Sequence, residues 1–411
     1  MRRWSRWMGV GAAAGIMMAL VPVVRGNIKL ENPLARLEKA RAPVSAAPDL
    51  DGLDLLRLEL RPERVTTPLP DGREAVLTLD PDVQRAAQST MRKYRIPEAG
   101  VVLMDVKTGR LLAYASYVNE GEKFDVNVRA EPPAASVFKV VTAAALVERA
   151  GLTASTEQCY HGGRSRILAD ELKDDPQRDK WCATLGMAVG RSLNVVIARL
   201  AQKHLTPEDE TAMGGAFGFG APVPFVVPNE APRIDIPDDP LEFARSAAGF
   251  WHTSLSPLAA VVLAQTVANR GIALEPRIVA SVFKGKDQLW QDDAGPRVLR
   301  RVIKPETADE VSRMMGETVQ NGSAFKSFHD RSGRPYLPGV KVAGKTGTLN
   351  REKANRMYTW FVGFAPAEQP EVAVAALAVN TPTWRIKGPD LAREVLRAYF
   401  VKKGIRGPDA P

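Results

Sequence analysis

The sequence predicts an α+β fold in which an antiparallel sheet is completed by strands from both ends of a folded region. Two β-type segments flank a turn early in the chain, Ala- and Val-rich helical patterns fill the middle, and three short β-branched or aromatic segments follow in the last third. Because two strands come first and three come last, the sheet must be assembled from distant parts of the chain.

The first 26 residues are expected to lie outside this fold. Three arginines among the first six residues precede an apolar run, Trp7–Val24, which is close to the roughly 20 residues that span a bilayer. Basic residues before such a run favour a cytoplasmic N-terminus. We expect one uncleaved transmembrane helix that leaves the rest of the chain outside the cytoplasmic membrane, in a periplasmic or other extracytoplasmic space. A cleaved signal peptide is the alternative, and it would also export the chain.

The next segment reads as a linker. It contains six prolines and scattered charge, with no sustained hydrophobic period. The sequence therefore predicts a membrane anchor or signal at 1–26, a linker at 27–72, a folded domain at 73–404 and a tail at 405–411.

Local signals place the expected helices and strands. Asp80 and Pro81 are suited to the N-cap and first turn of a helix that runs to about Tyr94. A hairpin is expected where 101–104 and 111–114 flank a turn at 107–109. The remaining helices are expected at 138–150, 195–204, 257–269 and 390–402, and the remaining strands at 341–349, 358–364 and 372–379.

The composition is that of an ordinary globular protein and excludes two kinds of function. Of 411 residues, 45% are hydrophobic and 25% are charged, which is enough to bury a sizeable core. The net charge of +9 is moderate, and no Lys/Arg block is interleaved with aromatic residues, so we expect no nucleic-acid partner. The four histidines show no ligand spacing with the cysteines, which argues against a metal site.

Two cysteines, Cys159 and Cys182, are the candidates for a disulfide. In an exported protein such a bridge is the favoured interpretation. Two separate buried thiols are the alternative.

Ser136 and Lys139 stand three residues apart at the start of the strongest apolar helix pattern. On a helix, this spacing places the amine near the hydroxyl. A buried lysine beside other cations can lose its proton and serve as the base that a serine nucleophile needs. We therefore expect Ser136 to be a nucleophile and Lys139 its base.

The same S-x-x-K pattern occurs twice more, in settings that we expect to be structural. Ser281 and Lys284 lie in a strand pattern, where a spacing of three puts the side chains on opposite faces. Ser323 follows the turn signal Asn321-Gly322, and no long helix pattern follows it.

Two further motifs gain meaning from their order after Ser136. A lysine, glycine and two hydroxyls within a strand pattern can hold a carboxylate where a ligand approaches the backbone closely; these residues are Lys345, Thr346, Gly347 and Thr348. An earlier K-T-G, at 107–109, sits where a hairpin must turn and is expected to be structural. Ser192 and Asn194 precede a helix pattern, where such residues are usually N-caps. Only the other two motifs make them site candidates.

The motifs S-x-x-K, S-x-N and K-T-G, in this order, are typical of penicillin-binding proteins and serine β-lactamases, and the chain resembles the transpeptidase domain of the former. The resemblance implies a five-stranded antiparallel sheet flanked by helices, beside an all-helical subdomain, with the active site between them. It also implies that no metal or organic cofactor is needed. The similarity covers roughly residues 75–402 and includes 78–84, 101–116, 218–220, 255–258 and 361–366.

The resemblance implies roles in acyl transfer. Ser136 would attack the penultimate D-Ala carbonyl of a peptidoglycan stem peptide, with Lys139 as general base and Ser192 relaying a proton to the leaving amine. Asn194 would bind the substrate backbone, and the N–H groups of Ser136 and Thr348 would form an oxyanion hole. The terminal carboxylate would be bound by Lys345, Thr346 and Thr348. One departure is that Ala134-Ala135 stands where relatives often have Pro-Gly.

The implied activity is D,D-transpeptidation. The implied partners are stem peptides, β-lactam antibiotics and the membrane. A cell-wall synthesis complex is a further candidate partner. A D,D-carboxypeptidase would use the same residues, and a serine β-lactamase would add fast hydrolysis of the acyl-enzyme. A non-catalytic scaffold or β-lactam sensor is the alternative of another class, although a scaffold would not need all three motifs intact. Trp251 is interpreted as a packed aromatic residue rather than a residue that lines the cleft.

Overall fold

The computed structural model describes residues 48–163, 166–351 and 355–408. The predicted anchor or signal, at 1–26, lies outside these residues, as do the first part of the predicted linker and the end of the predicted tail. Within the described ranges, no helix is both long enough and apolar enough to cross a bilayer.

A five-stranded antiparallel sheet forms the centre of the described chain, in the order β12-β13-β14-β4-β5. This confirms the predicted α+β layout, because two strands come from the first part of the domain and three from the last. The hairpin and the three late strands all lie where their patterns predicted them. The strands are β4 (Glu98–Asp105), β5 (Leu111–Val118), β12 (Ala343–Arg351), β13 (Arg356–Ala365) and β14 (Val372–Asn380).

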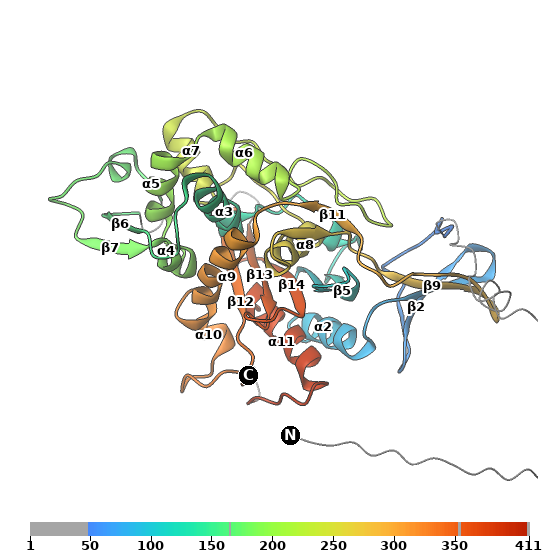
Figure 1. The fold of residues 1–411 in the computed structure, drawn as a ribbon. Coiled ribbons are helices and arrows are strands. Elements are labelled where there is room, and N and C mark those ends of the chain that lie inside the picture. The colour runs from blue at the N-terminus through green and yellow to red at the C-terminus, as the bar shows by residue number, and fades with distance from the viewer. Residues whose placement is uncertain (1–47, 164–165, 352–354, 409–411) are drawn as a thin grey trace, which may run out of the picture. The chain divides into compact units, whose positions relative to one another are not determined.

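Helices cover both faces of this sheet (Figure 1). On one face, α8 (Pro257–Ala268) is buried along its whole length and packs against β13 and β14. On the other face lie α2 (Pro81–Lys93) and α11 (Gly388–Val401). Successive side chains of β13 point to opposite faces of the sheet. Trp360 therefore packs in the core on the α8 side, and Phe361 packs in the core on the α11 side.

The segment between the hairpin and β12 is largely but not entirely helical, which corrects the expected all-helical subdomain. It contains an antiparallel ribbon of β6 (Glu157–Tyr160) and β7 (Trp181–Thr184), in which Cys159 pairs with Cys182. The two sulfurs form a disulfide bond. The helices of this segment are α3 (Lys139–Ala150), α4 (Leu185–Arg191), α5 (Asn194–His204), α6 (Pro207–Ala216), α7 (Pro240–Ala247), α9 (Pro305–Gln320) and α10 (Phe325–Phe328).

Part of the predicted linker, 27–72, is folded, and the domain therefore begins before residue 73. A second five-stranded sheet has the order β1-β2-β3-β9-β10. The prolines did not prevent strand formation: β1 pairs only with the start of β2, so Pro68 has no β1 residue opposite it. Its strands are β1 (Glu59–Leu60), β2 (Val65–Leu69), β3 (Arg73–Leu77), β9 (Val279–Lys284) and β10 (Asp287–Gln291).

Short elements complete the described fold. Strands β8 (Ile272–Leu274) and β11 (Val298–Arg301) pair with each other. Single 3₁₀ turns lie at Pro70–Gly72, Val126–Val128, Ala135–Val137 and Ala169–Leu172.

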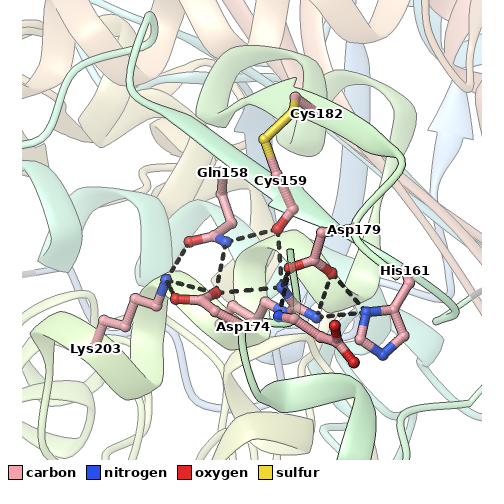
Figure 2. The surroundings of a disulfide bond; sticks show 9 residues. Gln158, Cys159, His161, Asp174, Asp179, Cys182 and Lys203 are labelled. Atoms are coloured by element: carbon pink, nitrogen blue, oxygen red, sulfur yellow. Dashed lines mark hydrogen bonds and ion pairs between the residues drawn. A yellow bond between two sulfur atoms is a disulfide. The ribbon is translucent and has the colours of Figure 1, made fainter. Parts of the chain in front are cut away.

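A buried arginine, Arg199, fixes the disulfide-bonded ribbon to α5. Two of its partners, Cys159 and Asp179, are labelled in Figure 2. The Arg199 guanidinium is fully buried and donates to both carboxylate oxygens of Asp179, at 2.8 and 3.0 Å. It also donates to the carbonyl oxygens of Cys159, at 2.9 Å, and Glu171, at 2.7 Å. These bonds satisfy most of the donors of the buried guanidinium, so the charge is both paired and hydrogen-bonded. The ribbon is thereby held to the helix that begins at Asn194.

We expect Arg199→Leu to lower the free energy of unfolding by about 3–5 kcal/mol, because it leaves the Asp179 carboxylate without its guanidinium partner. Arg178→Leu is the matched control, since Arg178 forms an exposed ion pair with Asp170 at 3.0 Å. Denaturant titration of both variants should show a large loss of stability for the first and almost none for the second. Equal denaturation midpoints for the two variants would contradict a structural role for Arg199.

Candidate active site

Ser136 lies in the 3₁₀ turn Ala135–Val137, immediately before α3. The predicted spacing brings the Nζ atom of Lys139 to 2.8 Å from the Oγ atom of Ser136. Ala135 has a φ of +49°, in the left-handed region that a residue with a Cβ rarely adopts. The turn is held from outside, since Trp360 Nε1 donates to the Pro133 carbonyl at 2.9 Å. The serine is therefore presented by a strained turn that its surroundings fix.

The contacts of Lys139 fit a neutral amine. Its Nζ atom lies 2.9 Å from the Asn194 side-chain oxygen and 2.5 Å from the Ala248 carbonyl oxygen. Both oxygens can only accept, so they take the two hydrogens of an uncharged amine. The remaining lone pair then faces the Ser136 hydroxyl, which can donate. This arrangement can remove the proton of Ser136.

Burial lowers the pKa of Lys139 well below its ordinary value, and the positive charge of Lys345 lowers it further. The Lys139 side chain is fully buried, and its Nζ makes no ion pair with a carboxylate in the described chain. No carboxylate there compensates an ammonium charge, so burial shifts the equilibrium toward the neutral amine.

Ser192 ends α4 in the left-handed conformation, with a φ of +59°. Its Oγ atom lies 3.1 Å from the Nζ atom of Lys345, on the buried side of β12. The N-cap of α5 is Leu193, so neither Ser192, the C-cap of α4, nor Asn194 is the N-cap of α5. The short turn between α4 and α5 instead directs Asn194 to Lys139 and Ser192 to Lys345.

Lys345 is fully buried, and burial lowers its pKa to about 7. The neighbouring Gly347 shows why the strand carries a glycine here. A Cβ atom at that position would lie 3.3 Å from the Ala134 carbonyl oxygen and 3.2 Å from a methyl group of Val137. The glycine therefore lets β12 approach the turn that carries Ser136, as the sequence predicted for a strand glycine.

The rival motifs lie elsewhere. Ser281 and Lys284 are on β9, the strand that the sequence predicted, in the second sheet. The earlier K-T-G forms the turn between β4 and β5, where Gly109 has a φ of +77°. The context arguments that separated these motifs from the site are consistent with this placement.

Ser323 lies beside the third motif, a position that the sequence did not predict. Its Oγ atom lies 2.5 Å from the Oγ1 atom of Thr346, and both residues line one cavity of 530 Å³. The prediction that Ser323 does not begin a long helix is confirmed, because α10 starts two residues later and is four residues long. The only signal in the sequence was the turn after α9, which does not indicate contact with β12.

Two more cavities adjoin the motifs. One, of 610 Å³, is lined by Thr348, Asn350 and Trp251, whose side chain is half exposed; the interpretation of Trp251 as a packed aromatic residue is therefore wrong. The other, of 380 Å³, opens at Ser192 and Asn194. A larger cavity of 830 Å³ between α4 and α9 is lined by none of the motif residues.

One cluster in the described chain has the spacing of a metal site, formed by Glu157 and the two cysteines. The cysteine sulfurs are joined to each other and offer no thiolate.

Comparison with known proteins identifies a family and relatives. Residues 99–399 match the family model of the penicillin binding protein transpeptidase domain. The chain is 27% identical over 401 residues to the peptidoglycan D,D-transpeptidase PbpA of Mycobacterium tuberculosis, covering 87% of this chain and 77% of that protein. It is 25% identical over 346 residues to the stage V sporulation protein D of Bacillus subtilis, and the match covers 78% of this chain and 52% of that protein. The fold is similar to the crystal structure of the D,D-transpeptidase domain of a peptidoglycan glycosyltransferase from Eggerthella lenta, with a TM-score of 0.66 and 25% identity. The match covers 80% of this chain and 83% of that chain.

We expect Lys345→Met to raise the pKa of Lys139, because it removes the positive charge that disfavours the ammonium form. In the parent protein Lys345 should titrate near pH 7, and the pKa of Lys139 should lie well below that of an ordinary lysine. Carbon-13 NMR of lysine Cε resonances measures both groups. The exposed Lys326, changed to Met, is the control and should leave the pKa of Lys139 unchanged.

Proposed function

The chain belongs to the penicillin-binding protein transpeptidase family, and from this premise we propose that it is a serine-type peptidoglycan D,D-transpeptidase whose acyl-enzyme forms on Ser136. The observation that carries the assignment of the nucleophile is the contact between Ser136 Oγ and a buried Lys139 whose other partners are both acceptors. These contacts support a serine that is activated without a histidine or a metal ion.

Acylation would begin when Lys139 takes the proton of Ser136 and the serine oxygen attacks the penultimate D-Ala carbonyl of a stem peptide. The N–H groups of Ser136 and Thr348 would stabilise the oxyanion of the tetrahedral intermediate. Collapse of this intermediate breaks the peptide bond, and the leaving D-Ala amine takes a proton through Ser192. The 3.1 Å contact of Ser192 with Lys345 supports this relay, since Lys345 has a pKa of about 7.

The terminal carboxylate of the substrate would bind to Lys345, Thr346 and Thr348. Thr348 is exposed and Thr346 is half-buried, so both hydroxyls can reach a ligand beside the strand. Asn194 both holds Lys139 and would donate its amide N–H to the substrate backbone. The hydroxyls of Thr346 and Ser323 share one hydrogen bond, so one of the two orients the other, and one hydroxyl hydrogen remains free to donate to the carboxylate.

Two observations support placing this catalytic domain outside the cytoplasmic membrane. The N-terminal apolar run follows basic residues, as in a single-pass anchor. The disulfide between Cys159 and Cys182 is typical of proteins in oxidising compartments. The proposal is a single-pass membrane protein that acts on peptidoglycan as part of the cell-wall synthesis machinery, and β-lactams would acylate the same serine.

The first test is covalent labelling of the full-length protein with a fluorescent penicillin, followed by a denaturing gel. The parent and Ser281→Ala should label, whereas Ser136→Ala should lose the label completely because it lacks the attacking oxygen. Ser281→Ala is the matched control, since it removes a serine from the same S-x-x-K pattern on β9. Labelling of the Ser136→Ala protein would refute the assigned nucleophile.

The second test addresses Ser323. We expect Ser323→Ala to lower the second-order rate of penicillin acylation roughly tenfold, equivalent to about 1.4 kcal/mol, because one hydroxyl of the carboxylate-binding pair is lost. Ser323→Thr keeps the hydroxyl and should restore most of the rate. Stopped-flow labelling measures both variants, and an alanine variant as fast as the parent would remove Ser323 from the substrate site.

A further inference from the structure

The chemistry of the second half-reaction determines where the acceptor amine must enter. Ser192 gives a proton to the leaving amine during acylation, and by microscopic reversibility the same group takes a proton from the incoming amine during transfer. The attacking nitrogen must therefore occupy the position that the leaving D-Ala amine has vacated, beside Ser192. The rest of the acceptor has to extend from that position into space that adjoins Ser192.

One cavity near the motifs adjoins Ser192, and its walls suit a peptide. It has a volume of 380 Å³ and is lined by Ser192 and Asn194 at its catalytic end and by Tyr160 and Trp181 on the ribbon. The two rings form a tilted pair with centroids 6.2 Å apart, and the Trp181 side chain is 57% exposed. Exposed aromatic surface beside a catalytic group is typical of a binding site.

A positively charged side chain lines the same cavity. Arg191, the last residue of α4, is exposed and lines the cavity next to Ser192. Within the described part of the chain, its guanidinium has no side-chain hydrogen bond and no ion pair, in contrast to the paired Arg199 on the next helix. An unpaired guanidinium suits a carboxylate, which it can bind through two parallel hydrogen bonds.

The aromatic wall is rigid. The disulfide joins the two ribbon strands at Cys159 and Cys182, the neighbours of Tyr160 and Trp181. Arg199 fixes the same ribbon to α5 through Asp179 and the Cys159 carbonyl. At Gly163, a Cβ atom would lie 2.4 Å from Val195, so the absence of a side chain lets the ribbon segment approach the start of α5. Such preorganisation lowers the cost of binding a flexible ligand.

We propose that this cavity is the subsite of the acceptor strand, an inference that rests on the proposed transpeptidase function. The ligand is a stem peptide with an aliphatic arm that ends in a primary amine. The arm lies across Trp181 and Tyr160, and a carboxylate of the same peptide binds Arg191. The donor peptide occupies the other side of the site, where Trp251 and Thr348 line the 610 Å³ cavity.

The transfer step balances without a further reagent. The acceptor nitrogen attacks the ester carbonyl carbon on Ser136, forming the new amide C–N bond. The C–O bond to Ser136 breaks, and the serine oxygen regains a proton from Lys139. One proton of the attacking amine passes through Ser192 to Lys345, which supplied the proton of the leaving D-Ala amine during acylation, so no net proton is consumed. When no amine occupies the cavity, water hydrolyses the same ester.

The test separates acceptor binding from acylation in the full-length protein. A D-Ala-D-Ala-terminated donor peptide is supplied with a synthetic stem peptide that carries a free side-chain amine, and the ratio of cross-linked to hydrolysed product is measured. We expect Trp181→Ala and Arg191→Ala each to lower this ratio at least fivefold while the rate of penicillin acylation stays within twofold of the parent. Trp181→Phe, which keeps an aromatic face, should restore most of the ratio.

Trp384→Ala is the matched control, because Trp384 is also exposed but lines none of the three cavities beside the motifs. Its product ratio should equal that of the parent. An unchanged ratio in the Trp181 and Arg191 variants overturns the acceptor subsite, and so does a parallel loss of acylation, which would assign the cavity to the donor. A parent that is never acylated would refute the proposed function instead.

Discussion

The site depends on the burial of one lysine amine without a counter-charge. Lys139 is enclosed by parts of the chain that are far apart in sequence: the turn of Ser136, the start of α5 at Asn194 and the carbonyl of Ala248. A carboxylate in any of these places would stabilise the ammonium form and remove the base. The fold therefore supplies neutral acceptors to the amine and brings a second cation, Lys345, to the far side of Ser192.

Close backbone approaches make this enclosure tight. Gly249 has a φ of +86°, and a Cβ atom there would lie 2.3 Å from the Ala135 carbonyl oxygen. Gly347 allows the equivalent approach from β12. The turn of Ser136 is thus compressed between the segment after α7 and the edge of the main sheet. This compression explains how Ala135 holds a left-handed conformation, which glycine adopts more readily.

Features encoded by local patterns could be predicted, and features that depend on distant contacts could not. Asp80 caps α2 and Gly151 ends α3, because caps act on their own helices. Strands β1 and β2 fall within the predicted linker, because the sheet that they join is completed through β3 by the distant strand β9, and short strands carry little periodicity. Ser323 was rejected as a nucleophile for sound local reasons, yet its contact with Thr346 is a tertiary one. The ribbon between α3 and α4 was likewise hidden by its short strands.

The order of the strands has a consequence for how the protein folds during its synthesis. The main sheet joins β4 and β5 to strands that are synthesised last, and Lys345 lies on one of these. A chain that grows from its N-terminus therefore displays Ser136 long before β12 can dock beside it. Until then the nucleophile turn lacks the wall that β12 forms, and the positive charge of Lys345 is not yet present to lower the pKa of Lys139. The site is therefore complete only once the C-terminal third of the chain has folded against the earlier parts.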